Sequence, residues 1–354
     1  MSADRSERWA SRLQRAWASR GVLACCLWPL SLLFAAVAAV RRAVYRRGWL
    51  RTASLPVPVV VVGNLIAGGA GKTPTVIAVV ALLRQRGFTP GIVSRGYGRH
   101  DAATRAVDAA TPVELAGDEP LLLHLRTGAP VQVGRDRAAA ARALLQRAPR
   151  VDIIVSDDGL QHLKLPRTAQ VLVFDERGAG NGWLLPAGPL RERLPARVPA
   201  RSVVLYNAPV PSTPLPGALA RRSLGGVLSL SDWWRTDRRA LRPLAELRGR
   251  PLLAVAGVAR PERFFTMLRQ SGLDITPLAL ADHHDFAVLP WPADNIDVIV
   301  TEKDAVKLKP GRAGTARVWV AALDFEPGRA FDTALLALLP DPPETADDHG
   351  NPIA

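Results

Sequence analysis

The most constraining feature of this sequence is a short run of valines that leads into a glycine-rich loop. Residues 57–62 read VPVVVV, which predicts a buried strand of a parallel sheet. Residues 63–75 then read GNLIAGGAGKTPT, and the apolar periodicity of VIAVVALLRQRG predicts a helix after them. A strand, a glycine loop and a helix in this order are the setting in which a phosphate-binding loop of the Walker A kind is expected.

The loop departs from the common Walker A pattern at Ile66, which replaces the glycine six residues before the lysine. The remaining core, GGAGKT at residues 68–73, keeps the chemistry, because its glycines let backbone N–H groups approach phosphate oxygens at a helix N-terminus. A glycine-rich turn with a chance Lys-Thr pair is the alternative. The predicted nucleotide-binding residues are Ile66, Ala67, Gly68, Gly69, Ala70, Gly71, Lys72 and Thr73.

Two side chains of this loop predict the cofactors. Lys72 is placed to reach the β- and γ-phosphates of ATP, and the hydroxyl of Thr73 to ligate Mg²⁺. Pro74 fits the first turn of the predicted helix, where a missing N–H costs nothing. ATP and Mg²⁺ are therefore the expected cofactors.

A second apolar run ends in two carboxylates. Residues 151–159 read VDIIVSDDG, which predicts a strand that ends in Asp157 and Asp158. A carboxylate at a strand end beside a phosphate loop commonly reaches the magnesium of the nucleotide. A solvated Asp-Asp-Gly turn is the alternative, and the preceding phosphate loop favours the metal.

Two smaller clusters also carry titratable groups. Asp118 and Glu119 stand at the start of a predicted helix, where acidic residues serve equally well as helix caps. His283 and His284 lie in ALADHHDF, residues 279–286. Zinc is disfavoured because no cysteine or third spaced histidine accompanies them. A histidine that handles protons is favoured, with two solvent-facing histidines as the alternative.

The N-terminal part combines an apolar run with concentrated positive charge. Residues 21–40 carry no charge, and a helix of this length reaches about 30 Å, the thickness of the hydrocarbon core of a bilayer. Residues 1–51 hold ten arginines against two acidic residues, which gives +8 of the net +14 of the chain. This bias favours anionic lipid over nucleic acid as a partner. We expect a membrane-associated helix that spans the bilayer or lies in one leaflet, with a buried core helix as the alternative.

The rest of the chain alternates strand and helix signals, which predicts an α/β fold with a P-loop NTPase-like parallel sheet. At 354 residues the chain is long enough for a second domain, because single cores stop growing near about 250–300 residues. The predicted parts are a membrane-associated helical segment at 1–50, a P-loop domain at 51–225 with a return of 326–342, and a smaller α/β domain with a two-stranded linker at 226–325.

Nine segments of the chain together resemble the tetraacyldisaccharide 4′-kinase family of lipid A biosynthesis, in sequence and in order. They are the apolar N-terminus, VGNLIAGGAGKTP, SRGYGR (94–99), GDEP (117–120), VGRDR (133–137), DDGLQH (157–162), LLPAGPLRE (184–192), DHHDF (282–286) and VTEKDAVKL (300–308). Leu160 stands where an aromatic residue is common, a change that we do not expect to alter the chemistry.

The resemblance implies a kinase that transfers the γ-phosphate of ATP to the 4′-hydroxyl of a membrane-embedded tetraacyldisaccharide 1-phosphate. It implies a glycolipid substrate, a membrane surface as partner, no nucleic acid, and a place on the cytoplasmic face of the inner membrane. The acyl-chain preference and the oligomeric state stay open.

The resemblance also implies roles for single residues. Asp118 would take or orient the proton of the sugar hydroxyl, and His283 would orient and polarise Asp118. Glu119 and Asp157 would join Thr73 around Mg²⁺. Because Asp118 and His283 fall in different predicted domains, we expect a closure between domains to join them. Arg95, Arg137, Gln161, His162 and Glu192 match family positions without a defined role.

Two other functions compete with the kinase. One is a membrane-associated ATPase switch of the deviant P-loop class, which typically carries a lysine where this chain has Ala67. The other is a nucleotide-binding membrane scaffold without catalysis, which would need neither Asp118 nor the histidine cluster.

Overall fold

The computed structural model describes residues 13, 15–99, 101–292 and 296–343. The chain folds into two compact units. Unit 1 comprises Met1–Val93, Arg137–Arg221 and Pro327–Ala354, and unit 2 comprises Ser94–Asp136 and Arg222–Glu326. Unit 2 thus takes in residues 94–136 in addition to the part of the chain for which a smaller α/β domain was predicted.

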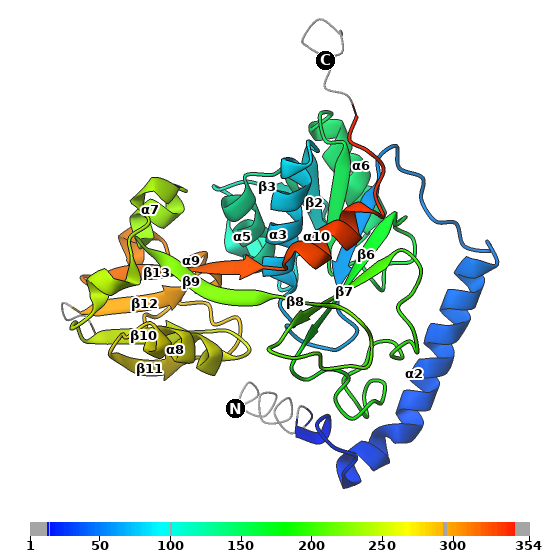
Figure 1. The fold of residues 1–354 in the computed structure, drawn as a ribbon, viewed down its shortest axis with the longest axis horizontal. Coiled ribbons are helices and arrows are strands. Elements are labelled where there is room, and N and C mark those ends of the chain that lie inside the picture. Colours follow the sequence, from blue (N-terminus) through cyan, green and yellow to red (C-terminus); the bar gives the residue numbers. More distant parts are fainter. Residues whose placement is uncertain (1–12, 14, 100, 293–295, 344–354) are drawn as a thin grey trace, which may run out of the picture. The chain divides into compact units, whose positions relative to one another are not determined.

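Unit 1 is built on a sheet of parallel strands (Figure 1). In spatial order they are β2 (Pro90–Ser94), β5 (Ile153–Asp157), β1 (Val59–Gly63), β6 (Ala169–Asp175), β7 (Ser202–Asn207) and β8 (Ala218–Leu219). Each strand is parallel to its neighbours in this list. The valine-rich strand predicted before the glycine loop is β1, at the centre of the sheet, and the predicted α/β fold is confirmed.

The valines of β1 are buried because helices and loops cover the sheet. All five residues of the strand are buried, a position that suits β-branched side chains. Helix α3 (Lys72–Gln85) packs against β1 and β5, and α10 (Arg329–Leu336) packs against β7. Helix α6 (Arg137–Arg147) adds alanine and leucine side chains to the same core. The carboxyl ends of β1 and β5 therefore meet at one edge, beside the loop that leads into α3.

Unit 2 contains a second, mostly parallel sheet. Its strands are, in spatial order, β11 (Ile275–Ala279), β10 (Leu252–Ala256), β12 (Asp297–Thr301), β13 (Arg317–Glu326) and β9 (Arg221–Ser229). A short antiparallel pair, β3 (Arg105–Val107) and β4 (Val131–Val133), belongs to the same unit. The helices are α4 (Val113–Ala116), α5 (Asp118–Thr127), α7 (Leu230–Trp234), α8 (Pro261–Gln270) and α9 (Glu302–Ala305). Three short 3₁₀ helices are η1 (Arg238–Ala240), η2 (Leu244–Leu247) and η3 (Pro310–Arg312).

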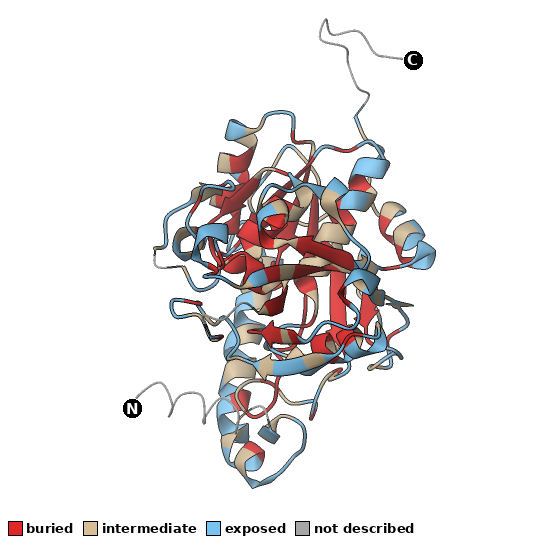
Figure 2. Cartoon of the chain, turned by 90° about the vertical axis from the view of Figure 1, so that its left-hand side faces the viewer, coloured by how far each residue is buried: buried red, intermediate tan, exposed pale blue. Residues whose placement is uncertain are grey.

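The apolar N-terminal run forms helix α2 (Val22–Arg46), which is long and apolar enough to cross a membrane by length and composition. Ala24 and Ser31 are the buried residues along it, whereas Leu33 and Val37 are 64% and 61% exposed. Figure 2 shows the same contrast, with pale exposed segments along this helix and red buried strands in the sheets. The alternative of a buried core helix is therefore wrong.

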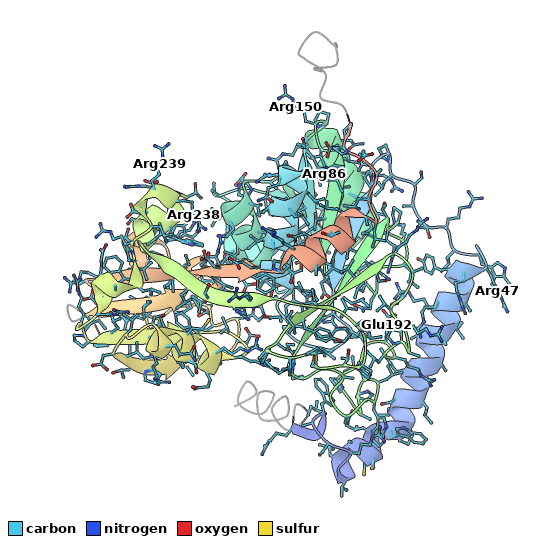
Figure 3. The ribbon with its side chains drawn as sticks, viewed as in Figure 1. Arg47, Arg86, Arg150, Glu192, Arg238 and Arg239 are labelled. Carbon is cyan, nitrogen blue, oxygen red and sulfur yellow. The ribbon has the colours of Figure 1, made fainter. Side chains whose placement is uncertain are left out.

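Polar contacts near both ends of the motif segment 184–192 help to hold α2 on the rest of unit 1, where Phe34 and Ala35 also pack against the core. The buried Ser31 donates through Oγ to the carbonyl of Leu184 at 2.8 Å and accepts from the amide of Ala187 at 2.9 Å. Near the other end of the helix, Arg42 lies 3.1 Å from the Glu192 carboxylate. Figure 3 shows Glu192 beside α2. The motif segment 184–192 is thus the docking surface of the helix.

Candidate active site

The phosphate loop joins β1 to α3 with two residues in the left-handed region of the backbone. Gly68 and Gly71 have φ of 90° and 91°, a conformation that favours glycine. Gly71 is the N-cap of α3, and Lys72 and Thr73 begin the helix. The loop of the predicted Walker A segment therefore ends at the positive end of a 14-residue helix, the arrangement that binds phosphate.

The side chain of Lys72 is buried and points at two partners in unit 1. Its Nζ donates to Asn64 Oδ1 at 3.2 Å and lies 3.7 Å from Asp158 Oδ1. Asp158 also accepts two bonds from Arg191, at 3.0 and 3.1 Å. Burial opposes ionisation of Asp158, but the charges of Lys72 and Arg191 outweigh it, so its pKa lies below the ordinary value. The lysine and the aspartate therefore meet as charged groups.

Two oxygen donors of unit 1 suit a magnesium ion. Asp157 is the last residue of β5 and pairs in register with Val62 of β1, so it stands at the carboxyl end of the strand, on the side of the sheet where the phosphate loop begins. The Thr73 hydroxyl stands in the first turn of α3, directly after the P-loop lysine. A buried carboxylate and a hydroxyl are the ligands that Mg²⁺ prefers. The third predicted ligand, Glu119, belongs to unit 2, and among the described residues no group of three His, Cys, Asp or Glu side chains could hold a metal by itself.

Segment 184–192 connects the phosphate loop to helix α2. The amide of Ala67 donates to Pro189 O at 2.8 Å, and buried Ile66 forms an isolated β-bridge with Leu190. Further along the segment, Glu192 accepts from Gln161 at 3.1 Å and from Arg42 of α2 at 3.1 Å. Of the family-matching positions without a predicted role, Gln161 and Glu192 thus lie in one polar network.

The predicted dyad is formed within unit 2. Asp118 is the first residue of α5, and its Oδ2 lies 2.7 Å from Nδ1 of His283. Its other oxygen accepts the amide of Glu119 at 3.1 Å, so the carboxylate is also held by the helix start. Both Asp118 and His283 belong to unit 2, and the expectation that a closure between domains is needed to join them was wrong.

The environment of the dyad favours charge on both partners. Burial raises the pKa of the Asp118 carboxyl, but the hydrogen bond from His283 and the charge of Lys303 outweigh it, and the net pKa is below the ordinary value. The hydrogen bond to Asp118 raises the pKa of His283 above its ordinary value, although burial opposes this. The neighbouring His284 instead packs its ring edge-on against Phe286, with centroids 4.9 Å apart.

Lys303 is a residue of this site that the sequence analysis did not single out. Its Nζ lies 3.4 Å from Glu119, 3.4 Å from Asp282 and 3.5 Å from Nε2 of His283. Burial lowers the pKa of Lys303, but Glu119, Asp118 and Asp282 outweigh it and raise the pKa. The residue stands in the family-like segment VTEKDAVKL, and that motif was the signal that could have pointed to it.

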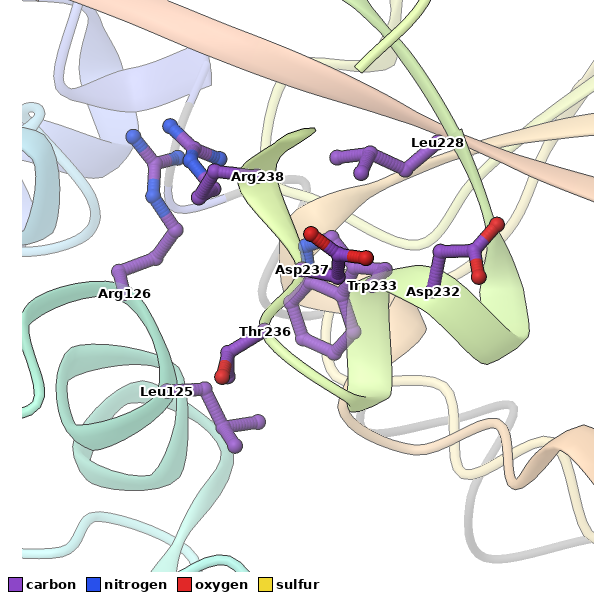
Figure 4. Close-up of a pocket in the computed structure, with 8 residues that line it drawn as sticks. All are labelled: Leu125, Arg126, Leu228, Asp232, Trp233, Thr236, Asp237 and Arg238. Atoms are coloured by element: carbon purple, nitrogen blue, oxygen red, sulfur yellow. The ribbon is translucent and has the colours of Figure 1, made fainter. Parts of the chain in front are cut away.

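A small cavity at the far end of α5 is not a nucleotide site (Figure 4). It is lined by Leu125, Arg126, Leu228, Asp232, Trp233, Thr236, Asp237 and Arg238. The cavity has room for about one water molecule. Arg126 forms an ion pair with Glu302, which also lies 4.0 Å from Arg238. This cluster serves to join α5 to α9.

Known proteins match almost the whole of this chain. A family model described as tetraacyldisaccharide-1-P 4′-kinase matches residues 23–340. The chain is 57% identical to a tetraacyldisaccharide 4′-kinase of Methylibium petroleiphilum, over 93% of this chain and 94% of the relative. It is 55% identical to one of Leptothrix cholodnii, over 95% of this chain and 97% of the relative.

A solved structure has the same fold. The crystal structure of "apo" form LpxK from Aquifex aeolicus in complex with ATP superposes with a TM-score of 0.74 at 26% identity, covering 90% of this chain and all of that one. Match length, identity and fold agree, and this chain belongs to the tetraacyldisaccharide 4′-kinase family.

Proposed function

We propose that this chain, an ATP-dependent tetraacyldisaccharide 4′-kinase of lipid A biosynthesis, uses Asp118 as the base that takes the proton of the 4′-hydroxyl. The observation that carries this proposal is the 2.7 Å contact between Asp118 and His283. A carboxylate with a lowered pKa is ionised at neutral pH and can accept a proton. The imidazole of His283 contacts one carboxylate oxygen, and the amide of Glu119 donates to the other. These two contacts fix the orientation of the base.

In the proposed reaction the 4′-oxygen attacks the γ-phosphorus of ATP. A new P–O bond forms, the bond from the γ-phosphorus to the bridging oxygen breaks, the hydroxyl proton moves to Asp118, and ADP leaves. Lys72 stabilises charge on the transferring phosphate, as expected for a reaction in which the protein mainly positions partners and neutralises charge. Thr73 and Asp157 of unit 1 would hold Mg²⁺, which when bound neutralises phosphate charge.

We also propose that the enzyme works at the cytoplasmic face of the inner membrane. The lipid substrate of a tetraacyldisaccharide kinase resides in a bilayer, and ATP is supplied from the cytoplasm. Helix α2 offers exposed apolar side chains, and the exposed Arg41, Arg46 and Arg47 at its C-terminal end suit anionic headgroups. The docking of α2 on segment 184–192 would bring the acceptor close to the phosphate loop of the same unit.

A direct assay tests the function. The purified chain is incubated with ATP labelled at the γ-phosphate and a tetraacyldisaccharide 1-phosphate in mixed micelles. Label that appears in the lipid, with ADP in equal amount, supports the kinase. Hydrolysis of ATP without lipid labelling would instead support an ATPase switch, and neither product would support a scaffold.

A further inference from the structure

Five consecutive carbonyl groups of the phosphate loop accept hydrogen bonds from side chains of unit 1. The pairs are Ala67 O with Arg177 Nη1 at 3.2 Å, Gly68 O with Asn64 Nδ2 at 3.0 Å, Gly69 O with Arg177 Nη2 at 2.8 Å, Ala70 O with Asn207 Nδ2 at 3.1 Å, and Gly71 O with Thr75 Oγ1 at 2.8 Å. Three of these five contacts come from Arg177 and Asn207, which lie in other parts of the chain.

These contacts fix the direction of the amides. In a trans peptide the carbonyl and the N–H of the following residue point in opposite directions. Carbonyls 67–70 are bonded to the protein, so the N–H groups of residues 68–71 turn away from those partners. The left-handed conformation of Gly68 and Gly71 lets successive amides converge, which is the geometry of an anion-binding nest.

Arg177 is itself held in place by a buried carboxylate. Asp175, at the end of β6, is 1% exposed and accepts from Nε and Nη2 of Arg177 at 2.8–3.1 Å. Together with the bonds to Ala67 and Gly69, these contacts use four of the five guanidinium N–H groups. The guanidinium is therefore bonded to Asp175 and to the loop carbonyls, which makes it a support of the loop rather than a phosphate ligand.

Asn207 supports the last turn before the helix. It ends β7, is 2% exposed, and donates to Ala70 O. A Cβ added at Gly71 would lie 2.1 Å from Asn207 Nδ2, so the amide fills the space directly against the N-cap of α3. The two residues that support the loop thus stand at the end of β7 (Asn207) and two residues after the end of β6 (Arg177).

We propose that Arg177 and Asn207 are positioning residues for ATP, which act on the nucleotide through the carbonyls of the phosphate loop. They orient the amides of residues 68–71 toward the phosphates before the nucleotide arrives, so that binding needs little reordering of the loop. The proposal rests on the ATP-dependent kinase function, but it concerns nucleotide binding alone and leaves the lipid acceptor site unchanged.

The test measures the dissociation constant of a fluorescent ATP analogue for the full-length protein in detergent, without lipid acceptor. Arg177→Ala should weaken binding about tenfold, because two charge-assisted hydrogen bonds to the loop are lost. Arg177→Lys keeps the charge and one donor, and should recover part of the loss. Arg197→Ala, an exposed arginine of the same unit, is the matched control and should bind as the parent does.

Asn207 allows an isosteric variant that does not depend on how Arg177→Ala folds. Asn207→Asp replaces the donor with an oxygen that faces Ala70 O and adds negative charge near the phosphates, so it should weaken binding more than Asn207→Ala does. In the kinase assay, Arg177→Lys and Asn207→Ala should raise the KM for ATP and leave that for the lipid unchanged.

Two results would contradict the proposed positioning role of Arg177 and Asn207. One is an ATP dissociation constant within about twofold of the parent in both Arg177→Ala and Asn207→Asp. The other is an equal rise in the KM of both substrates together with a lower Tm, which is the mark of general destabilisation. If the parent bound ATP but labelled no lipid, the proposed function would be wrong. The comparison of ATP dissociation constants would still test the positioning role of Arg177 and Asn207.

Discussion

The Nδ1 atom of His283 lies 2.7 Å from Oδ2 of Asp118, although 165 residues separate the two in the sequence. Asp118 begins α5, and His283 has a positive φ of 64° in the turn that follows β11. The amide of His283 donates to Gly257 O at 3.2 Å, and the amide of Gly257 donates to the buried Asp304. The backbone of His283 is therefore fixed by Gly257, which is itself held by Asp304.

The dyad should behave as a unit. Asp118→Ala and His283→Ala should each lower kcat by about 10²–10⁴-fold, the range for lost general acid–base catalysis, with little change in the KM for ATP. The double variant should be hardly worse than the more damaged single variant, because residues that act together are non-additive. His284→Ala is the control and should lose much less, because its ring packs on Phe286. Effects that multiply in the double variant would mean independent roles.

The histidine also predicts a pH dependence of stability. Its pKa is raised in the folded chain by the bond to Asp118, so it stabilises the fold below its ordinary pKa of about 6.5, and this contribution is lost as pH rises through the raised pKa. The gap in Tm between the parent and His283→Gln should therefore shrink from about pH 6 to about pH 9. The lowered pKa of Asp118 adds no slope in this window, since that carboxyl stays ionised. A gap that stays constant would contradict the pairing.

Lys303 should set the acid limb of the pH–rate profile. Its charge helps to keep the pKa of Asp118 low, so Lys303→Met should raise that pKa and move the acid limb of kcat/KM to higher pH. Lys303→Arg keeps the charge and should leave the limb near its original position. A loss of activity that is equal at every pH would mean that Lys303 has only a structural role.

Local patterns predicted the parts of the site that lie close together in the sequence. β1, the glycine loop and α3 follow one another, so valine burial, the phosphate loop and the start of the helix could be predicted directly from residues 57–75. The contact of Lys303 with Glu119 depends on how α9 packs near α5, and the bond of Arg177 to Gly69 spans 108 residues. Neither contact produces a periodic pattern in the sequence, because only the folded chain brings the partners together.

Lys72 offers the most direct test of the phosphate loop. Its Nζ lies between Asn64 and Asp158 at the start of α3, where it can meet the transferring phosphate. Lys72→Ala should lower kcat by on the order of 10³, or about 4 kcal/mol of transition-state stabilisation. The measurement is the rate of lipid labelling at saturating ATP. Activity within about threefold of the parent would refute the assignment of this lysine.

The exposed face of α2 should carry the membrane binding, separately from the contacts that dock the helix. Deleting the helix would also remove the bonds of Ser31 and Arg42 to segment 184–192, which touches the phosphate loop, so a deletion would confuse the two roles. The double variant Leu33→Gln/Val37→Gln changes exposed side chains alone. It should weaken binding to anionic vesicles by at least about 3 kcal/mol, roughly a hundredfold, because two apolar side chains no longer enter the bilayer.

The same variant should bind ATP as tightly as the parent, because its docking contacts remain. Ser31→Ala provides the opposite case: it should pellet with vesicles normally but loosen segment 184–192, because the amide of Ala187 and the carbonyl of Leu184 lose their buried partner. Binding of the parent should also weaken as salt rises, since the arginines at the end of α2 contribute electrostatic attraction. Vesicle pelleting of Leu33→Gln/Val37→Gln at the level of the parent would show that the membrane contact lies elsewhere on the chain.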